Sequence, residues 1–243
     1  MKKKYLILIT LTFMITFICG ACSNKIILGD TVIKSNAKEI NAQSSNVTDI
    51  PDLSQCKNVE KLMLDYNNIS DINPLSSLKN LEELTLISNE ISDISPLSNL
   101  SNLKVLGLIN NKIDSIESLS NCTKLEKLWL SNNEIHDISS LGNLKNITNL
   151  CLDRNKITDI SVLDKIRNLK ELSLDFNNIH DYSLLKNLTS LTSLGLNNTT
   201  ITDVSVLYNL KNLKKLRLCN TNISEEQKSE LKKALPNCNI RFE

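Results

Sequence analysis

The chain of 243 residues carries 28 basic and 27 acidic side chains, so its net charge is +1 at pH 7. This balance gives no basic stripe of the kind that nucleic-acid binding needs, and we expect no nucleic-acid partner. The length could hold one or two ordinary domains. An internal repeat occupies most of the chain and leaves no room for a second globular unit of useful size.

Residues 1–21 have the composition of an export signal and resemble a lipoprotein signal peptide. Lysines at residues 2–4 are followed by an apolar run over residues 6–18, which is shorter than the about 20 residues that a membrane-spanning helix needs. The run ends in Cys-Gly-Ala-Cys at residues 19–22, which resembles a bacterial lipobox. The resemblance implies lipidation of Cys22, with the exported protein held by acyl chains at the outer face of the bacterial cell membrane. The alternative is an ordinary secretory signal that is cleaved nearby without lipidation.

Between the signal and the repeats we expect two short segments. Residues 22–35 show no repeat pattern and are predicted to form a tether. Residues 36–57 match the repeat well in their second half but poorly in their first, where Ala37, Ile40 and Ala42 stand at core positions. We interpret residues 36–57 as a degenerate repeat that caps the N-terminal end of the core.

A 22-residue pattern then recurs without insertion. Its copies begin at Asn58, Asn80, Asn102, Lys124, Asn146, Asn168, Ser190 and Asn212. A repeat of this period is one supersecondary unit that buries its apolar face only by stacking on its neighbours. Apolar residues two apart, such as Leu62 and Leu64, predict a short strand, and the later three-residue spacings predict 3-10 turns.

The fold class predicted by this pattern is an α/β leucine-rich repeat solenoid. The resemblance of these units to leucine-rich repeats implies a curved horseshoe, with a parallel β-sheet on its concave side and short 3-10 turns on the convex side. Seven repeats fill residues 58–211, and residues 212–243 hold the last repeat and a C-terminal cap. Ser224 and Gln227 form a capping box that should begin an α-helix, Pro236 should end it, and the sequence CNIRF should add a closing strand.

Two polar columns run through the repeats, and we assign both to structure. The tenth position holds Asn67, Asn89, Asn111, Asn133, Asn155 and Asn177, then Thr199 and Thr221. An asparagine side chain can satisfy the backbone groups that are buried where the chain leaves the strand. The fourteenth position holds Asp49, Asp71, Asp93, Asp137, Asp159, Asp181 and Asp203, with Ser115 interrupting. Each aspartate should cap the following turn, and a calcium ridge is the less favoured alternative.

The cysteines and histidines do not form reactive or metal-binding groups in this frame. Cys56 and Cys122 replace core leucines, whereas Cys151 and Cys219 fall on the exposed strand face. Each pair is three repeats apart, roughly 14 Å at the strand spacing, beyond the about 7 Å that a disulfide tolerates. The two histidines stand two repeats apart, and no nucleophile, phosphate-loop or metal motif is present. We therefore expect no enzyme activity, no cofactor and no metal.

Units such as NEISDISPLSNLSNLKVLGL, over roughly residues 46–223, resemble those of internalin-type leucine-rich repeat proteins of Gram-positive bacteria. The resemblance implies a curved solenoid whose concave face grips a protein partner, as the best-known members grip host-cell proteins. The chain departs from that family in having no obvious long helical N-cap, no immunoglobulin-like domain after the repeats and no LPxTG signal. A role in host invasion is therefore not carried over.

The fourth, sixth and eighth positions of each repeat should project onto the concave face, with the ninth beside them. The only tryptophan, Trp129, stands at a sixth position, where the fold requires no large side chain. Ile87, Val105 and Ile109 complete an apolar patch around it, and exposed apolar clusters rimmed by charge often mark interaction sites. The candidate ligand-binding residues are Trp129, Ile109, Ile87, Val105, Arg154, Phe176, Tyr66, Asp153 and Asp175. The alternative is that scattered exposed apolar residues have no role.

We therefore predict a lipid-anchored bacterial surface protein that binds a protein partner of unknown identity on its concave face. The alternative function is a carbohydrate-binding or envelope-structural lipoprotein, with Trp129, Tyr66 and Phe176 as platforms for sugar stacking. A third reading, a cytosolic scaffold similar to the phosphatase-1 regulatory subunits of eukaryotes, is opposed by the signal segment.

Overall fold

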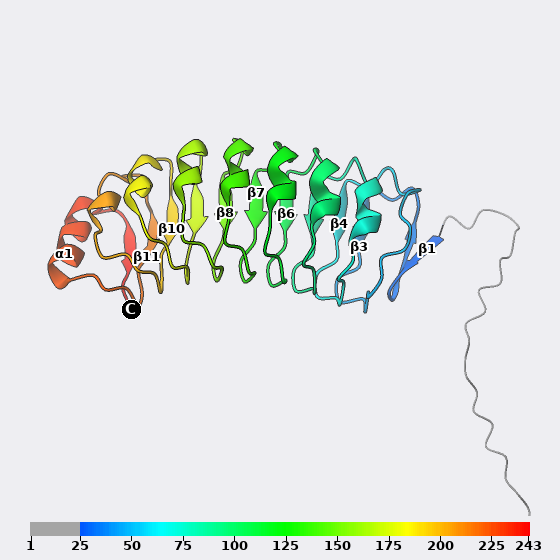
Figure 1. Ribbon diagram of the computed structural model, residues 1–243, viewed down its shortest axis with the longest axis horizontal. Helices are drawn as coiled ribbons and strands as arrows, with labels where there is room; N and C mark the ends of the chain where they lie inside the picture. The colour runs from blue at the N-terminus through cyan, green and yellow to red at the C-terminus, as the bar shows by residue number, and fades with distance from the viewer. Residues whose placement is uncertain (1–24) are drawn as a thin grey trace, which may run out of the picture.

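The computed structural model describes residues 25–243 and shows a curved solenoid, as predicted (Figure 1). The predicted signal peptide and Cys22 lie outside the described residues. Ten strands form one parallel sheet in chain order. They are β3 (Glu39–Asn41), β4 (Lys61–Met63), β5 (Glu83–Thr85), β6 (Val105–Gly107), β7 (Lys127–Trp129), β8 (Asn149–Cys151), β9 (Glu171–Ser173), β10 (Ser193–Gly195), β11 (Lys215–Arg217) and β12 (Asn239–Arg241).

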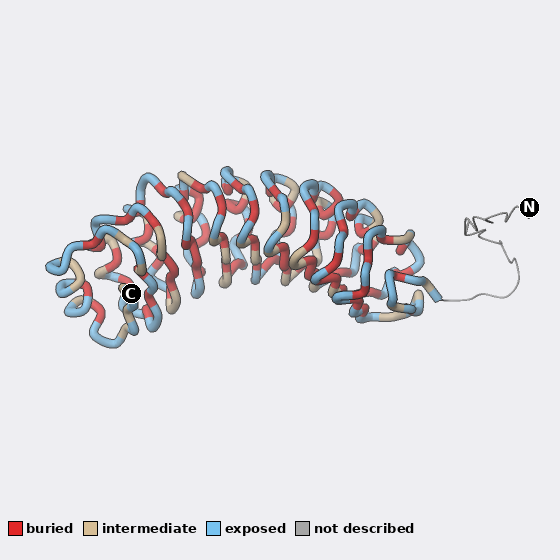
Figure 2. The backbone as a smooth tube through the Cα atoms, turned by 90° about the horizontal axis from the view of Figure 1, so that it is seen from below, coloured by how far each residue is buried: buried red, intermediate tan, exposed pale blue. Residues whose placement is uncertain are grey.

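Each strand from β3 to β10 pairs with the strand 22 residues further along the chain, so equivalent repeat positions lie side by side. Leu84 is opposite Leu106, and Leu106 is opposite Leu128. The chain returns between strands through 3-10 turns, which are drawn as coils along the outer side of the curve in Figure 1. These turns are η1 (Asn73–Ser77), η2 (Ser95–Asn99), η3 (Glu117–Asn121), η4 (Ser139–Asn143), η5 (Ser161–Lys165), η6 (Ser183–Asn187) and η7 (Ser205–Leu207). Figure 2 shows the curvature of the whole solenoid.

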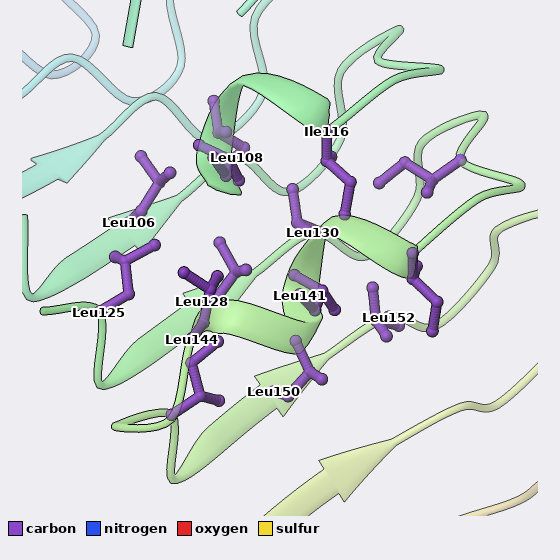
Figure 3. Packing of buried hydrophobic residues seen from close by; sticks show 14 of the residues in the cluster. Leu106, Leu108, Ile116, Leu125, Leu128, Leu130, Leu141, Leu144, Leu150 and Leu152 are labelled. Atoms are coloured by element: carbon purple, nitrogen blue, oxygen red, sulfur yellow. The ribbon is translucent and has the colours of Figure 1, made fainter. Parts of the chain in front are cut away.

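The core is one continuous stack of leucine and isoleucine side chains between the sheet and the turns (Figure 3). Leu106, Leu128 and Leu150 come from successive strands, whereas Leu141 of η4 and Leu144, the residue after it, close the stack; all five are 0% exposed. Cutting one such leucine back to alanine costs about 2–5 kcal/mol, because the neighbours in a stacked core collapse only partly. Cys56 and Cys122 are 0% exposed within the same stack, as predicted.

The tenth-position asparagines hold the turn that follows each strand. Asn133 donates to the carbonyl oxygens of Leu108 and Leu130, at 2.9 and 3.0 Å, and accepts a hydrogen bond from the backbone N–H of Ile113 at 3.1 Å. The other asparagines of the column make equivalent bonds. Thr199 keeps one of them, donating to the carbonyl of Leu196 at 2.7 Å. The structural role predicted for this column is confirmed.

The fourteenth-position aspartates cap the 3-10 turns, in the geometry of an Asx turn. Asp93 accepts hydrogen bonds from the backbone N–H and the hydroxyl of Ser95, at 2.8 and 3.0 Å. Equivalent bonds lower the pKa of Asp137 below its usual value, first through the backbone N–H of Ser139. The first member of the column differs from the prediction: Asp49 accepts from Thr48, and Asp52 caps instead. The degenerate repeat begins its turn three residues later than the pattern predicts.

The ninth position of every repeat adopts a left-handed backbone conformation. The residues there are Tyr66, Ser88, Asn110, Asn132, Arg154, Phe176, Asn198 and Asn220, with φ between 51° and 58°. Asparagine tolerates this region better than other residues with a side chain, and bulky residues are outliers in it. The repeated asparagine therefore suits the backbone, whereas Tyr66, Arg154 and Phe176 do not.

The segment predicted to be a tether is folded from Lys25 onward, so that part of the prediction is wrong. Residues 25–34 form an antiparallel hairpin of β1 (Lys25–Leu28) and β2 (Thr31–Lys34). Leu28 and Ile33 are 0% and 6% exposed and join the core at its N-terminal end. The hairpin and the degenerate repeat that carries β3 together close this end of the solenoid.

The opposite end is closed as predicted. Helix α1 (Glu225–Ala234) begins after Ser224, whose hydroxyl accepts a hydrogen bond from the backbone N–H of Gln227 at 3.2 Å. The helix packs on the end of the core through Leu231, which is fully buried, and β12 adds the last strand of the sheet. The hairpin and α1 therefore lie at the two ends of the solenoid (Figure 1).

Candidate binding surface on the concave sheet

Trp129 lies at the middle of the concave sheet, on β7, and its indole reaches back over the preceding strand. Gly107 of β6 is its partner in the ladder. A Cβ atom at Gly107 would stand 3.3 Å from Cε3 of Trp129, 3.3 Å from Cγ2 of Thr85 and 3.5 Å from Cγ1 of Ile87. The missing side chain at Gly107 thus makes a shallow seat, which the indole shares with Thr85 and Ile87.

The other predicted apolar residues surround this seat. Val105 lies at the start of β6 and pairs with Lys127 of the Trp129 strand. Ile87 and Ile109 occupy the same position in consecutive repeats, joined through the backbone bond from Ser88 N–H to the carbonyl of Ile109. The side chains of Trp129, Ile87, Val105 and Ile109 are all partly exposed. We call these four residues the apolar patch; the structure brings them together, and nothing in the repeat requires a tryptophan among them.

The two aspartates of the predicted site, Asp153 and Asp175, form hydrogen bonds within the concave sheet. Asp153 accepts hydrogen bonds from Ser131, Ser173 and the backbone N–H of Asp175. Asp175 is 8% exposed and accepts from the backbone N–H of Asn197 at 2.9 Å. Burial raises the pKa of Asp175 above its usual value, opposed by that backbone hydrogen bond. Each of these carboxylates accepts a hydrogen bond from a backbone N–H of the next repeat, so each helps to hold neighbouring repeats together.

Arg217 belongs to the same cluster and was not predicted. Its guanidinium donates to Ser173 Oγ at 2.9 Å and lies 3.2 Å from Oδ2 of Asp175. To reach them it crosses Gly195, where a Cβ atom would stand 2.5 Å from Nη2 of Arg217. The sequence does contain a signal for this arrangement. In both cases a glycine at the sixth position is followed, one repeat later, by a large side chain: Gly107 by Trp129 and Gly195 by Arg217.

Phe176 and Arg154 form a second exposed feature beside the sheet. The Arg154 guanidinium lies 3.9 Å from the centroid of the Phe176 ring, a cation–π geometry. Phe176 is 40% exposed, and Tyr66, in the same column, is 64% exposed. Three pairs of neighbouring side chains in this column are hydrogen-bonded, among them Asn132 and Asn110 at 2.5 Å. The Arg154–Phe176 stack interrupts this ladder.

The remaining polar candidates stay apart from the patch. His136 and His180 are exposed on the loops that lead into the 3-10 turns. The five cysteines of residues 25–243 are unpaired, so neither the Cys56–Cys122 pair nor the Cys151–Cys219 pair forms a disulfide, as predicted. Burial raises the pKa of Cys151, next to Trp129 in the ladder, to about 11. Its thiol is therefore protonated and weakly nucleophilic at neutral pH.

Open hollows lie on the convex side between successive 3-10 turns, and another is lined by Phe176, Asn155 and Thr200 beside the Arg154–Phe176 stack. The first of them, between η2 and η3, is lined by serines and by Asp93, Asp114 and Glu117. Such hollows recur from turn to turn, and Asp93 is used to cap its own turn, so they follow from the repeat. Within residues 25–243 no helix combines the length and the apolar character that crossing a membrane requires.

Comparisons with known proteins agree with this architecture. The family model for leucine-rich repeats (2 copies) matches residues 79–121, 123–165 and 167–209, together just over half of the chain. A search of curated proteins finds no significant match. The crystal structure of an internalin (inlF) from Listeria monocytogenes is 30% identical, with a TM-score of 0.76, over 87% of this chain and 69% of that one.

Two further structures show how far the likeness extends. Internalin C2 from the same organism is 29% identical, with a TM-score of 0.73, over 79% of this chain and 85% of that one. The ectodomain of the Arabidopsis thaliana receptor kinase GASSHO1/SCHENGEN3, solved in complex with CASPARIAN STRIP INTEGRITY FACTOR 2, is 24% identical with a TM-score of 0.68. That match covers 82% of this chain and 27% of the receptor, and it shows the shared fold. Leucine-rich repeat domains commonly act as protein-binding scaffolds without catalysis. The chain belongs to the leucine-rich repeat family and is an internalin-like member of it.

Proposed function

We propose that this protein is exported and lipid-anchored at Cys22 on the outer face of a bacterial cell membrane, where its concave face binds a protein partner without catalysing a reaction. The observation that carries the proposal is the seat at Gly107, which holds the only tryptophan on the concave sheet. Trp129 adds nothing that the repeat needs, because the other sixth positions hold residues as different as Thr85 and Cys151.

The chemistry of the apolar patch suits a protein partner. Tryptophan and arginine are enriched among residues that dominate protein interfaces, and such residues sit in the middle of an interface behind a polar rim. The patch lies near the centre of the ten-strand sheet. On one side of it is the pair Lys61 and Glu83, 3.2 Å apart, and on the other is the Arg154–Phe176 stack. A partner that buries the patch would meet charged groups at its edges.

A sugar-binding function receives less support. Stacked sugars need aromatic faces that are open and close together, yet Tyr66 and Phe176 are five repeats apart, about 24 Å at the strand spacing. One face of Phe176 is also occupied by Arg154. Cys151, the thiol beside Trp129, is a poor nucleophile at neutral pH because burial raises its pKa to about 11.

The concave-face proposal is tested by cross-linking on intact cells, followed by recovery of the protein with its covalently attached neighbours. The variant is Trp129→Ala with Ile109→Ser, and the matched control is His136→Ala, an exposed change on the other side of the solenoid. We expect the wild type and the control to recover the same partner and the double variant to lose it. Recovery of that partner by the double variant at wild-type yield would refute the assignment. Binding to purified peptidoglycan instead would favour the envelope alternative.

The anchor is tested separately. Cells expressing the wild type or Cys22→Ala are grown with a radioactive fatty acid, and the label on the purified protein is measured. We expect label on the wild type alone. An unlabelled wild type that is nevertheless exported would indicate an ordinary secretory signal.

A further inference from the structure

The N-terminal hairpin presents an outer face that the solenoid leaves uncovered. Strand pairing places Lys25 opposite Lys34 and Ile27 opposite Val32. Because side chains alternate along a strand, these four residues share the face opposite to the buried Leu28. Ile27 and Val32 are 71% and 61% exposed, whereas the large core side chains of the repeats are almost fully buried. We call these four residues the hairpin face.

The charges of the hairpin face are also unpaired. Within residues 25–243 neither Lys25 nor Lys34 has a carboxylate within 4.0 Å. By contrast, several lysines on the repeats pair with a glutamate one repeat away, as Lys104 does with Glu82 at 2.6 Å. A pair of aliphatic side chains flanked by two unpaired lysines is a small amphipathic surface with positive charge.

The hairpin is fixed rigidly to the first repeat, so the direction of this face is set. The N–H of Asp30 donates to the carbonyl of Ser45 at 2.7 Å, and Asn46 donates to the Asp30 carboxylate at 2.6 Å. Gly29 has φ of +57°, and a Cβ atom there would overlap the Ser45 carbonyl oxygen. The turn therefore docks by its backbone, and the hairpin face points away from the repeats.

We propose that the hairpin face rests on an anionic lipid surface. The proposal depends on the lipid anchor at Cys22 proposed above. Lys25 is three residues beyond Cys22, and three residues of chain span at most about 11 Å. A chain anchored at Cys22 thus keeps β1 within the reach of the lipid headgroups. Lysines gain from the negative potential of such a surface, and aliphatic side chains gain by entering the boundary between headgroups and acyl chains.

The contact gives the solenoid a defined orientation. The sheet runs from β3 beside the hairpin to β12 beside α1, so its long axis leads away from the membrane. Trp129, four strands after β3, then stands about 20 Å further out than the first strand, at the usual strand spacing. The concave face is turned sideways, where a partner can reach it without meeting lipid.

The test uses the lipidated protein reconstituted into vesicles of phosphatidylglycerol and phosphatidylcholine with brominated acyl chains, which quench indole fluorescence at close range. Ile27→Trp is introduced into a Trp129→Phe background, so that position 27 carries the only indole. The matched control is Gln55→Trp in the same background, an exposed site of the degenerate repeat at the same end of the solenoid. We expect the brominated lipid to remove most of the emission from position 27 and little from position 55.

Charge is tested by adding Lys25→Glu with Lys34→Glu to the Ile27→Trp protein. The reversal should restore emission from position 27 while the lipidated protein still sediments with the vesicles. Equal quenching at positions 27 and 55, or quenching that survives the reversal, would overturn the proposal. Co-sedimentation without quenching refutes the hairpin contact but keeps the anchor, whereas failure of the wild type to sediment with vesicles refutes both. Self-association of the soluble Cys22→Ser chain that is lost in Ile27→Asp would assign the face to a second copy instead.

Discussion

Asn133 offers the sharpest test of how the repeat is held together. Its carboxamide makes three hydrogen bonds to buried backbone groups: two to carbonyl oxygens and one to an N–H. Each of the two carbonyl oxygens, those of Leu108 and Leu130, also accepts a hydrogen bond from another asparagine. Leu108 O also accepts from Asn111, and Leu130 O also accepts from Asn155. Replacing Asn133 with alanine therefore leaves both carbonyls with one bond each. The group left without this partner is the backbone N–H of Ile113, which only Asn133 serves.

The magnitude follows from this distinction. A buried donor without a partner costs about 1–3 kcal/mol, and each hydrogen bond lost where the partner stays satisfied costs about 0.5–1.5 kcal/mol. We therefore expect Asn133→Ala to lower the free energy of unfolding by about 3 kcal/mol. Asn133→Thr should cost roughly 1 kcal/mol less than alanine, because a threonine hydroxyl keeps the bond within its own repeat, as Thr199 does with Leu196.

The assay is urea unfolding followed by circular dichroism, with amide hydrogen exchange to locate the effect. Asn121→Ala, an exposed change at the end of η3, is the control and should alter the unfolding free energy by less than about 0.5 kcal/mol. Exchange at the Ile113 amide should accelerate more than at amides two repeats away. A cost below about 1 kcal/mol for Asn133→Ala would refute the reasoning, because it would mean that the Ile113 N–H is satisfied in another way.

Three further changes probe other parts of the molecule. Phe176→Asn should stabilise the fold by about 1 kcal/mol in urea unfolding, because asparagine suits the left-handed backbone there; a fall in stability would contradict this strain argument. Gly29→Ala should undock the hairpin from Ser45 and speed amide exchange over residues 25–34 while the repeats stay protected; unchanged exchange would show that the turn can shift. Alkylation should spare Cys122 until the protein unfolds. At Cys151, whose pKa is raised to about 11, the rate should rise about tenfold per pH unit from pH 8 to 10 because the thiolate is the reactive form; a plateau near pH 9 would contradict that pKa.

The repeat period predicted most of the fold because equivalent residues meet in register. Knowing the period was enough to place Trp129 on the concave sheet and Cys122 in the core. The hairpin was missed because it lies outside the periodic part. A signal for it existed nonetheless, since KIIL and TVIK are apolar-rich segments separated by Gly29 and Asp30, a two-residue turn.

The roles of the concave polar residues could not be predicted in the same way. Asp153 and Asp175 were expected to face a ligand, but each accepts hydrogen bonds from the next repeat, which depends on backbone positions that the sequence does not specify. The left-handed ninth position did have a signal in its recurring asparagines. Phe176 is an exception in that column, because a bulky side chain is unfavourable in a left-handed backbone conformation.

The two glycine seats divide the concave face into surfaces with different capacities for binding. At Gly195 the seat is filled by Arg217, whose charge is met by Asp175 and whose guanidinium also bonds to Ser173, so a ligand there would have to break existing bonds. At Gly107 the seat is bordered by Thr85, Ile87 and the Trp129 indole, which remains partly exposed. Covering that indole breaks no hydrogen bond within the sheet and removes apolar surface from water, which stabilises a complex. A partner therefore gains more at the middle of the sheet than at its polar C-terminal part, although both are built by the same repeat.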